Sequence, residues 1–180
     1  MPIFRNLYVK LLCWGGRAID IRLANKYPSN MLSNLCEHVF VIDGIRCRSM
    51  EGFLQSLKVK DREEQRRICS LFGKEAKRSS TEEWKARQIL YWQGGEIRRE
   101  SPDFKALILR AYSFLFAYDK SFREALLSTR GKILCHTLGK QNPKETILTE
   151  KEFCDTLAAL RDPESMVKLM ESFIAEGYYK

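Results

Sequence analysis

Apolar residues recur every three or four positions in two long segments of the chain, which is the spacing of one buried helix face. The first segment contains Phe104, Leu107, Ile108, Ala111, Leu115 and Phe116. The second contains Phe153, Leu157 and Leu160. These stripes predict two core helices, and we assign them no chemistry.

Short capping patterns predict where helices begin, because a side-chain oxygen before a helix accepts hydrogen bonds from its free N–H groups. Ser49 is suited to cap a helix that carries Glu51 in its first turn. Four further starts are predicted at Ser80-x-x-Glu83, Ser101-Pro102, Thr149-x-x-Glu152 and Asp162-Pro163.

Turn formers between apolar runs predict two hairpins. Residues 39–42 and 45–47 flank Asp43-Gly44, a pair that readily adopts the positive φ angles of a tight turn. Residues 89–97 carry Gly94-Gly95 between apolar flanks, which predicts a second hairpin or an open loop. Residues 138–149 are too polar for a helix and form the longest candidate functional loop.

Together these elements predict a mainly α fold of the α+β class. We expect one compact helical domain over residues 1–180, with small β-hairpin elements. A chain of 180 residues that is 44% hydrophobic is long enough to bury one core.

Charge and cysteine usage narrow the function classes. There are 31 Lys and Arg against 23 Asp and Glu, which favours an anionic partner such as a nucleotide or nucleic acid. The six cysteines lack zinc-site spacing and the two histidines are far apart, so we expect no metal site and no cofactor. With no secretory signal or bilayer-spanning run, we expect a cytoplasmic protein with reduced thiols and no membrane partner.

A polar row on the helix after Ser49 is the first candidate site. At about 100° per residue, Glu51, Gln55 and Lys58 share one side of the helix, beside its apolar stripe. Gln rather than Lys follows Glu51 at four positions, which suits three groups facing one ligand better than an ion pair. Spacing alone still favours an ordinary solvated face, because every amphipathic helix has a polar side.

Residues upstream of this row favour a functional site over a solvated face. In order and spacing, the chain resembles the NADAR (YbiA-like) family at Leu32-Ser33-Asn34, Asp43-Gly44 and Ser49-x-Glu51-x-x-x-Gln55-x-x-Lys58. Residues 30–60 carry the resemblance, which continues more loosely to Leu160-Arg161. It implies a YbiA-like compact, mainly helical fold with small β elements.

The resemblance implies hydrolysis of N-glycosidic bonds in ribosylated bases, without a metal. The expected substrate is ADP-ribosylated guanine in DNA, RNA or a nucleotide, with ADP-ribose as the product. An ADP-ribosyltransferase toxin is a further candidate partner. Two alternatives stay open: a phosphorylated riboflavin-pathway intermediate as the substrate, and a non-catalytic module that binds ADP-ribose or nucleic acid.

The implied roles begin with Glu51 as the key carboxylate, which activates water or stabilises the oxocarbenium-like transition state at the ribose. Gln55 holds the ligand or water through its amide, and Lys58 offsets phosphate charge. Ser33 and Asn34 provide loop hydrogen bonds to ribose or phosphate, although a turn or cap is the ordinary role of such a pair.

Three further candidates each have an ordinary alternative. Trp92 stacks on the base or is a core tryptophan beside the Gly-Gly turn, and Trp84 is a weaker candidate for stacking. Glu145 is a second acid or a solvated loop glutamate. His136 binds the substrate or makes structural hydrogen bonds.

Two departures from the family pattern are expected to reshape the pocket. Cys47 stands where the family has an aromatic residue, and Gly52 stands where many relatives have His. The absent side chain of Gly52 is expected to leave room beside Glu51.

Overall fold

The computed structural model describes residues 2–162, 164, 167, 168, 171 and 175. Its helices are α1 (Pro2–Trp14), the short 3-10 helix η1 (Asn30–Leu32), α2 (Met50–Ser56), α3 (Arg62–Cys69), α4 (Gly73–Lys77), α5 (Trp84–Arg87), α6 (Pro102–Tyr118), α7 (Lys120–Leu127) and α8 (Glu150–Arg161). Its strands are β1 (Ala18–Asp20), β2 (Phe40–Ile42), β3 (Ile45–Cys47), β4 (Ile89–Trp92), β5 (Gly95–Arg98) and β6 (Ile133–Cys135). The fold is mainly helical with short strands, as predicted. Within the described residues, no helix is both long and apolar enough to cross a membrane.

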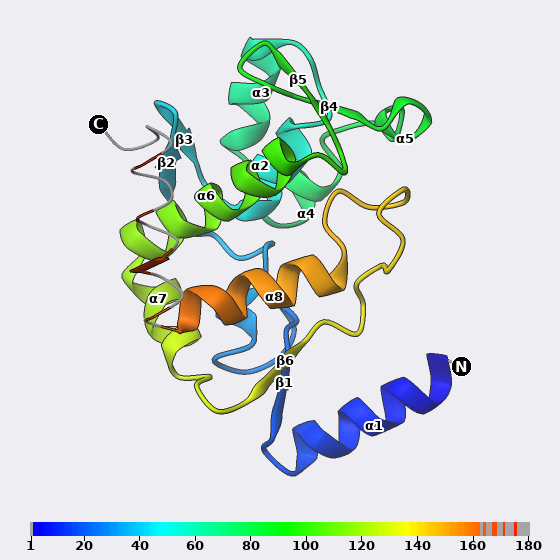
Figure 1. Ribbon diagram of the computed structural model, residues 1–180, viewed down its shortest axis with the longest axis vertical. Helices are drawn as coiled ribbons and strands as arrows, with labels where there is room; N and C mark the ends of the chain where they lie inside the picture. The colour runs from blue at the N-terminus through cyan, green and yellow to red at the C-terminus, as the bar shows by residue number, and fades with distance from the viewer. Residues whose placement is uncertain (1, 163, 165–166, 169–170, 172–174, 176–180) are drawn as a thin grey trace.

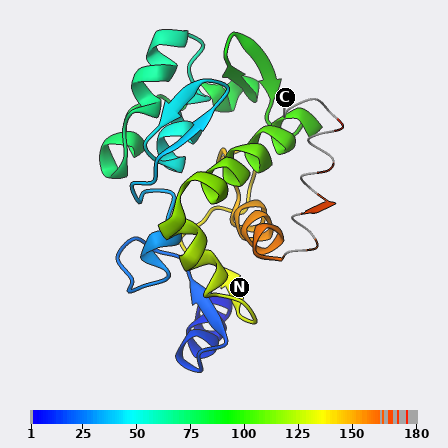
Figure 2. The same ribbon diagram turned by 90° about the vertical axis from the view of Figure 1, so that its left-hand side faces the viewer.

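The central helix of the fold is α6 (Figures 1 and 2). It packs against α2, α7, α8 and the strands β2 and β5. In Figure 1 the two hairpins, α3 and α5 lie above α6, while α8 runs below it. Its buried residues include most of the predicted stripe: Phe104, Leu107, Ile108, Ala111 and Leu115. The stripe therefore forms the middle of the core.

The Asp-Gly hairpin forms as predicted and is anchored at its tip. β2 pairs antiparallel with β3, and the turn residues Asp43 and Gly44 have φ angles of 49° and 76°. The Asp43 carboxylate accepts hydrogen bonds from Arg110 of α6 and, at 2.7 Å, from the Trp92 indole of β4. One turn carboxylate thus joins this hairpin to both α6 and the second hairpin.

Residues 89–98 form a closed hairpin rather than an open loop. β4 pairs antiparallel with β5, and the turn residues with positive φ are Gln93 and Gly94, at 50° and 89°. Buried Gln65 of α3 holds the hairpin, because its Nε2 donates to the Tyr91 carbonyl at 2.7 Å. Its Oε1 also accepts the Gln93 N–H at 3.1 Å.

Three of the predicted helix starts are confirmed. The hydroxyls of Ser49 and Ser101 each accept the N–H three residues further on, and Pro102 is the first residue of α6. Thr149 and Glu152 form a complete capping box at the start of α8.

The start predicted at Ser80 is wrong. α5 begins at Trp84 and has no side-chain cap, while the Ser80 hydroxyl donates to Gln55 Oε1 instead. The hydroxyl therefore serves a tertiary contact rather than a helix end. The start predicted at Asp162-Pro163 lies partly outside the described residues.

β1 and β6 form a parallel pair that the hydrophobic pattern did not indicate. Ala18 pairs with Ile133 and Asp20 with Cys135, two segments far apart in the sequence. Such short strands carry no hairpin turn between them, so local patterns give no signal of the pairing. The pair brings His136, the residue after β6, beside the segment that follows β1.

Gly52 is a packing position, which corrects the expectation that it leaves room beside Glu51. A Cβ atom at residue 52 would lie 2.7 Å from the Leu71 carbonyl oxygen and 2.9 Å from that of Ile68. α2 therefore approaches the C-terminal end of α3 so closely that only glycine fits. Cys47, the other departure, is also fully buried in the core.

A buried ion pair joins the segment before β2 to the start of α7. His38 Nδ1 lies 3.0 Å from Asp119 Oδ2, and His38 Nε2 donates to the Met31 carbonyl at 2.7 Å. Burial disfavours charge on the imidazole, but Cys36 and Asp119 outweigh it and raise the pKa of His38 to about 9. With an acceptor at each ring nitrogen, His38 is an imidazolium at neutral pH.

Gly52→Ala is expected to destabilise the protein by about 1–3 kcal/mol, because overpacking against backbone atoms outweighs the gain of roughly 1 kcal/mol in helix propensity. Urea denaturation followed by circular dichroism measures the change. Gly15→Ala is the control, since a Cβ there meets its nearest atom at 3.5 Å. Wild-type stability in Gly52→Ala would contradict the close approach.

Asp119→Asn is expected to lower stability by roughly 1–3 kcal/mol at about pH 6. The raised pKa of His38 contributes stability that is complete below about pH 6.5, the unfolded value, and is lost as the pH rises through about 9. The deficit should therefore shrink across that window. An asparagine at position 119 can still accept the Phe122 N–H at the start of α7. The variant therefore removes the negative charge and keeps the helix cap. In urea denaturation across this range, a deficit independent of pH would contradict the ion pair.

Candidate functional site

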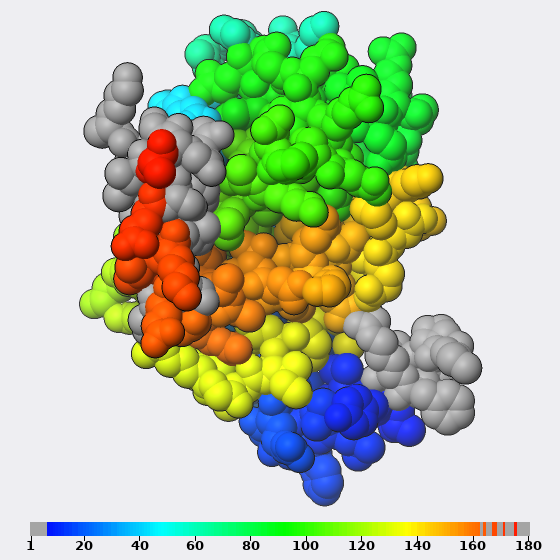
Figure 3. All heavy atoms as spheres, in the orientation of Figure 1, coloured from blue at the N-terminus to red at the C-terminus, as the bar shows by residue number. Residues whose placement is uncertain are grey.

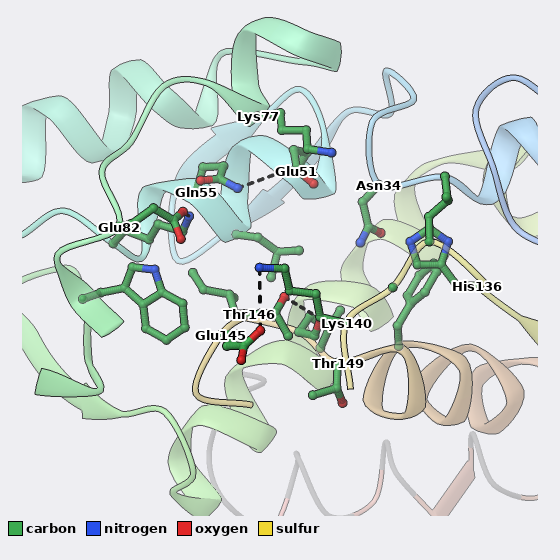
Figure 4. A pocket seen from close by; sticks show the side chains of 18 residues that line it. Asn34, Glu51, Gln55, Lys77, Glu82, His136, Lys140, Glu145, Thr146 and Thr149 are labelled. Atoms are coloured by element: carbon green, nitrogen blue, oxygen red, sulfur yellow. Dashed lines mark hydrogen bonds and ion pairs between the residues drawn. The ribbon is translucent and has the colours of Figure 1, made fainter. Parts of the chain in front are cut away.

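A cavity of about 450 Å³ opens between α2, the 138–149 loop and the start of α8 (Figure 4). Its polar lining is Asn34, Glu51, Gln55, Lys58, Lys77, Glu82, His136, Lys140, Glu145, Thr146 and Thr149. Its apolar lining includes Leu54, Trp84, Leu138, Ile147, Leu148 and Phe153. This volume falls in the range of small-molecule sites, about 300–1,000 Å³. Glu51 and Gln55 of α2, and Lys58 in the turn that follows it, thus face a cavity rather than open solvent.

Glu51 is held through both its backbone and its side chain. Its N–H donates to the Asn34 carbonyl at 2.8 Å. One turn later, Gln55 Nε2 donates to Glu51 Oε1 at 2.9 Å, and Gln55 Oε1 accepts from the Ser80 hydroxyl at 2.5 Å. Among the described residues, no donor is bonded to Glu51 Oε2. The carboxylate is therefore oriented by one oxygen and offers the other to a ligand.

The lysines of the cavity are partly neutralised by acids. Lys58 Nζ lies 2.9 Å from Glu82 Oε1, and the Lys58 side chain is only 7% exposed. Lys140 Nζ lies 4.0 Å from Glu145 Oε2. Lys77 has no ion-pair partner among the described residues, and in Figure 4 its ammonium lies on the Glu51 side of the cavity. A ligand phosphate would therefore find an unpaired cation near the key carboxylate.

Lysines also keep Glu82 ionised. Burial opposes its ionisation, but hydrogen bonds from Lys85 and Lys58 outweigh that cost and hold the pKa of the Glu82 carboxyl below its usual value. Glu82 thus acts as a counter-ion at the edge of the cavity rather than as a proton donor.

Asn34 and His136 lie at the other end of the cavity, and each is tied to the core. The Tyr112 hydroxyl of α6 donates to Asn34 Oδ1 at 2.7 Å, which directs the amide nitrogen toward the cavity (Figure 4). Burial raises the pKa of Tyr112 well above its usual value, so the phenol keeps the proton it donates. His136 Nδ1 donates to the Ile21 carbonyl at 2.7 Å, which leaves Nε2 for a ligand.

The loop wall of the cavity is held by a buried arginine. Arg99 is 1% exposed and donates to both carboxylate oxygens of Glu152, at 2.6 and 3.0 Å. Its Nε also donates to the Thr146 carbonyl at 3.1 Å. Burial opposes ionisation of Glu152, but hydrogen bonds from Arg99 and Thr149 lower its pKa. One ion pair therefore secures the loop and the start of α8 together.

Residues 26–162, which include every residue that lines the cavity, match a family model described as "Bacteriophage protein GP30.3". The chain belongs to the GP30.3 family. One relative is an uncharacterized 17.1 kDa protein of the Gp30-rIII intergenic region of Enterobacteria phage T4. It is 42% identical over 147 residues, which cover 80% of this chain and 97% of that protein.

The GP30.3-family chain also has a YbiA-like fold, as the resemblance predicted. The NMR structure of the E. coli protein YbiA is similar with a TM-score of 0.54 and 15% identity, covering 85% of this chain and 88% of that one. At this identity the likeness shows the fold alone. Family and fold together support a NADAR-type domain.

Most of the predicted site residues meet in the cavity of this GP30.3-family protein. They are Asn34, Glu51, Gln55, Lys58, His136 and Glu145. Glu145 has a 58% exposed side chain and contacts Lys140 and Asn142 of its own loop, as a solvated loop glutamate does. The roles of these residues stay predictions, but their grouping in space follows the sequence pattern.

Ser33 and Trp92 do not line the cavity. Ser33 follows η1, and its hydroxyl accepts the Leu35 N–H at 3.3 Å, which is the turn or cap role. Trp92 is 7% exposed and packs edge-on against Phe53, with ring centroids 5.1 Å apart. The predicted stacking of Trp92 on the base is therefore wrong. Side chains alternate between the two faces of β4, and Trp92 is on the face that packs into the core. Trp84 is the tryptophan that lines the cavity.

The sequence reading missed five polar lining residues of the GP30.3-family site, Lys77, Glu82, Lys140, Thr146 and Thr149, as well as Tyr112, whose hydroxyl orients Asn34. Lys140 and Thr146 lie in the loop that was predicted to be functional, so composition pointed to the segment but not to the side chains. Lys77 and Tyr112 belong to helices α4 and α6 and carry no local signal. Neither Gly52 nor Cys47 lines the cavity. In the described part of the chain, no group of three or more His, Cys, Asp or Glu residues is placed to hold a metal ion.

Arg99→Met is expected to cost about 3–5 kcal/mol, because it leaves the Glu152 charge without its buried partner. It should also speed tryptic cleavage after Lys140 and Lys144, since the Thr146 carbonyl loses its donor. Urea denaturation and a timed digest under native conditions measure the two effects. Arg98→Met, an exposed neighbour, is the control and should change stability by at most about 0.5 kcal/mol. Equal cleavage in both variants would contradict the loop anchor.

Proposed function

We propose that this protein is an N-glycosidase that removes ADP-ribose from guanine bases of nucleic acid or nucleotides. The observation that carries the proposal is the Glu51 carboxylate, oriented by Gln55 and open at Oε2 inside a cavity that also holds cations and an indole. The resemblance to the NADAR family supplies the reaction class, and the YbiA-like fold supports it.

The reaction breaks the bond between ribose C1′ and a nitrogen of the base. The bonding electron pair leaves with the base, the oxygen of a water molecule bonds to C1′, and a proton from that water passes to the base nitrogen. Positive charge builds up on the ribose in the transition state, so a carboxylate beside it lowers the barrier. We assign this role to Glu51, which either stabilises that charge or accepts the proton of the attacking water.

The other cavity residues fit the remaining parts of ADP-ribose. Lys77 and Lys140 offer cations to the diphosphate, with Lys140 exchanging its distant contact to Glu145 for a phosphate oxygen. The Asn34 amide nitrogen is a donor for ribose hydroxyls or for the departing base. The Trp84 indole lines the cavity but is only 4% exposed, so it offers a purine an apolar contact at its edge rather than a stacking face.

Incubation with ADP-ribosylated guanine nucleotide, followed by chromatography, is expected to show release of ADP-ribose. Glu51→Gln should slow release by about a thousandfold or more, since it removes the charge that stabilises the transition state. Calorimetry should show that this variant still binds ADP-ribose, because the cations and the indole remain. Full activity of Glu51→Gln would contradict the mechanism.

Glu63→Gln on the exposed side of α3 is the matched control and should keep wild-type activity. Two outcomes would replace the proposal with another function. Release from a phosphorylated ribosylaminopyrimidine, with none from guanine, would assign the riboflavin-pathway substrate. Tight ADP-ribose binding without turnover of either compound would assign a binding module.

A further inference from the structure

The candidate site is one end of a longer groove. The cavity of Glu51 shares Lys58 and Trp84 with a second cavity of about 370 Å³, which is lined also by Tyr91 and Arg87. The second cavity shares Arg87 and Ile89 with a third, of about 430 Å³. The three hollows therefore follow one another along α5 and β4. The first and third lie where the segment 84–100 meets the 138–149 loop, green beside yellow in Figure 3, whereas the second is lined by Lys58 and by residues within 83–91.

Positive charge increases along this groove away from Glu51. The third cavity is lined by Arg87, Arg98 and Lys144, all exposed, together with Arg99. Arg99 is already paired with a carboxylate, whereas the other three cations form no ion pair with any described residue. The acid in this third cavity is Glu100. Unpaired cations in a hollow favour an anion with several charges spaced along its length.

Aromatic side chains occur between the cations. Trp84 and Tyr91 both line the second cavity, but Trp84 is 4% exposed, so the ring that a base along the groove can stack on is that of half-buried Tyr91. Cationic grooves with aromatic side chains are the usual binding surface for single-stranded nucleic acid, since phosphates bind the cations and bases stack on the rings.

At the third cavity, hydrogen bonds join the segment 84–100 to the 138–149 loop. Gln88 Nε2 donates to the Lys85 carbonyl at 2.8 Å and to the Lys144 carbonyl at 3.2 Å, which ties α5 to the loop. Arg99 adds its bond to the Thr146 carbonyl. A preformed groove loses little conformational entropy when a strand binds.

We propose that this groove binds the strand of a single-stranded nucleic acid next to its modified base, so that the substrate is a polymer rather than a free nucleotide. This rests on the proposed function for the identity of the modified base. Arg87, Arg98 and Lys144 bind backbone phosphates, while Tyr91 stacks with a base beside the one that is cleaved.

The test combines binding with turnover. A fluorescein-labelled, unmodified single-stranded DNA oligonucleotide is titrated with protein at several salt concentrations, and its anisotropy gives Kd. Replacing Arg87, Arg98 and Lys144 together by Ala is expected to weaken Kd roughly tenfold or more, and to reduce the slope of log Kd against log salt by about 2. Release of ADP-ribose from a modified mononucleotide should stay unchanged, because these three residues lie outside the catalytic cavity.

Two further variants test whether DNA binding depends on this groove or only on the net positive charge of the protein. Replacing Lys10, Lys26 and Arg46 by Ala removes the same number of exposed cations elsewhere and should leave Kd nearly unchanged. A variant with Arg87→Lys, Arg98→Lys and Lys144→Arg keeps the charges and should bind like wild type. Equal weakening by both alanine variants, or none by either, would overturn the groove. Tighter binding of a duplex than of the strand would overturn the single-strand assignment.

The proposed function and the groove fail in different ways. If the wild type releases no ADP-ribose from any guanine substrate, the function is wrong, and the anisotropy measurements still decide whether the groove exists. If mononucleotide and oligonucleotide are cleaved equally well in wild type and in the alanine variant of the groove, the function stands and the polymer preference is wrong.

Discussion

The ion pair between Arg99 and Glu152 is the contact on which the rest of the site depends. Arg99 is almost wholly buried, so its charge requires a partner, and Glu152 provides both oxygens. The same carboxylate caps α8 through Thr149, and the same guanidinium holds the Thr146 carbonyl. One buried ion pair thus connects the start of α8, the 138–149 loop and the residue that follows the second hairpin. Without it, the loop would keep the Gln88 bond to the Lys144 carbonyl but lose the donor to the Thr146 carbonyl.

The cavity combines an oriented carboxylate with cations whose charges are only partly neutralised. Gln55 holds one oxygen of Glu51, while Lys58 and Lys140 face glutamates that a phosphate can displace or join. Such an arrangement avoids a large uncompensated charge in the empty cavity and still attracts an anion. The second and third cavities each have fewer acids than the cavity of Glu51, so the attraction for an anion extends beyond Glu51.

Local sequence patterns correctly predicted turns and helix caps that depend on hydrogen bonds between residues close in the chain. The hairpin at Asp43-Gly44 and the caps at Ser49 and Thr149 rest on hydrogen bonds within a few residues, and all three are present. Ser80 has the same capping pattern, yet its hydroxyl bonds to Gln55 across the cavity edge. A capping pattern thus states what a side chain can do, and tertiary neighbours decide which partner it takes.

The sequence by itself determined the mainly helical class, the core stripes of α6 and α8, and the position of Glu51 and Gln55 on one side of α2, because periodicity depends only on residue spacing. The helix predicted to continue through Lys58 ends at Ser56, so Lys58 reaches the cavity from the turn that follows. Tertiary structure alone decided that Trp84 rather than Trp92 lines the cavity, and that Gly52 packs against α3 instead of making room for a ligand. Both outcomes depend on which surface approaches from a distant segment. Residue spacing carries no information about that surface, since it is set by how whole elements pack.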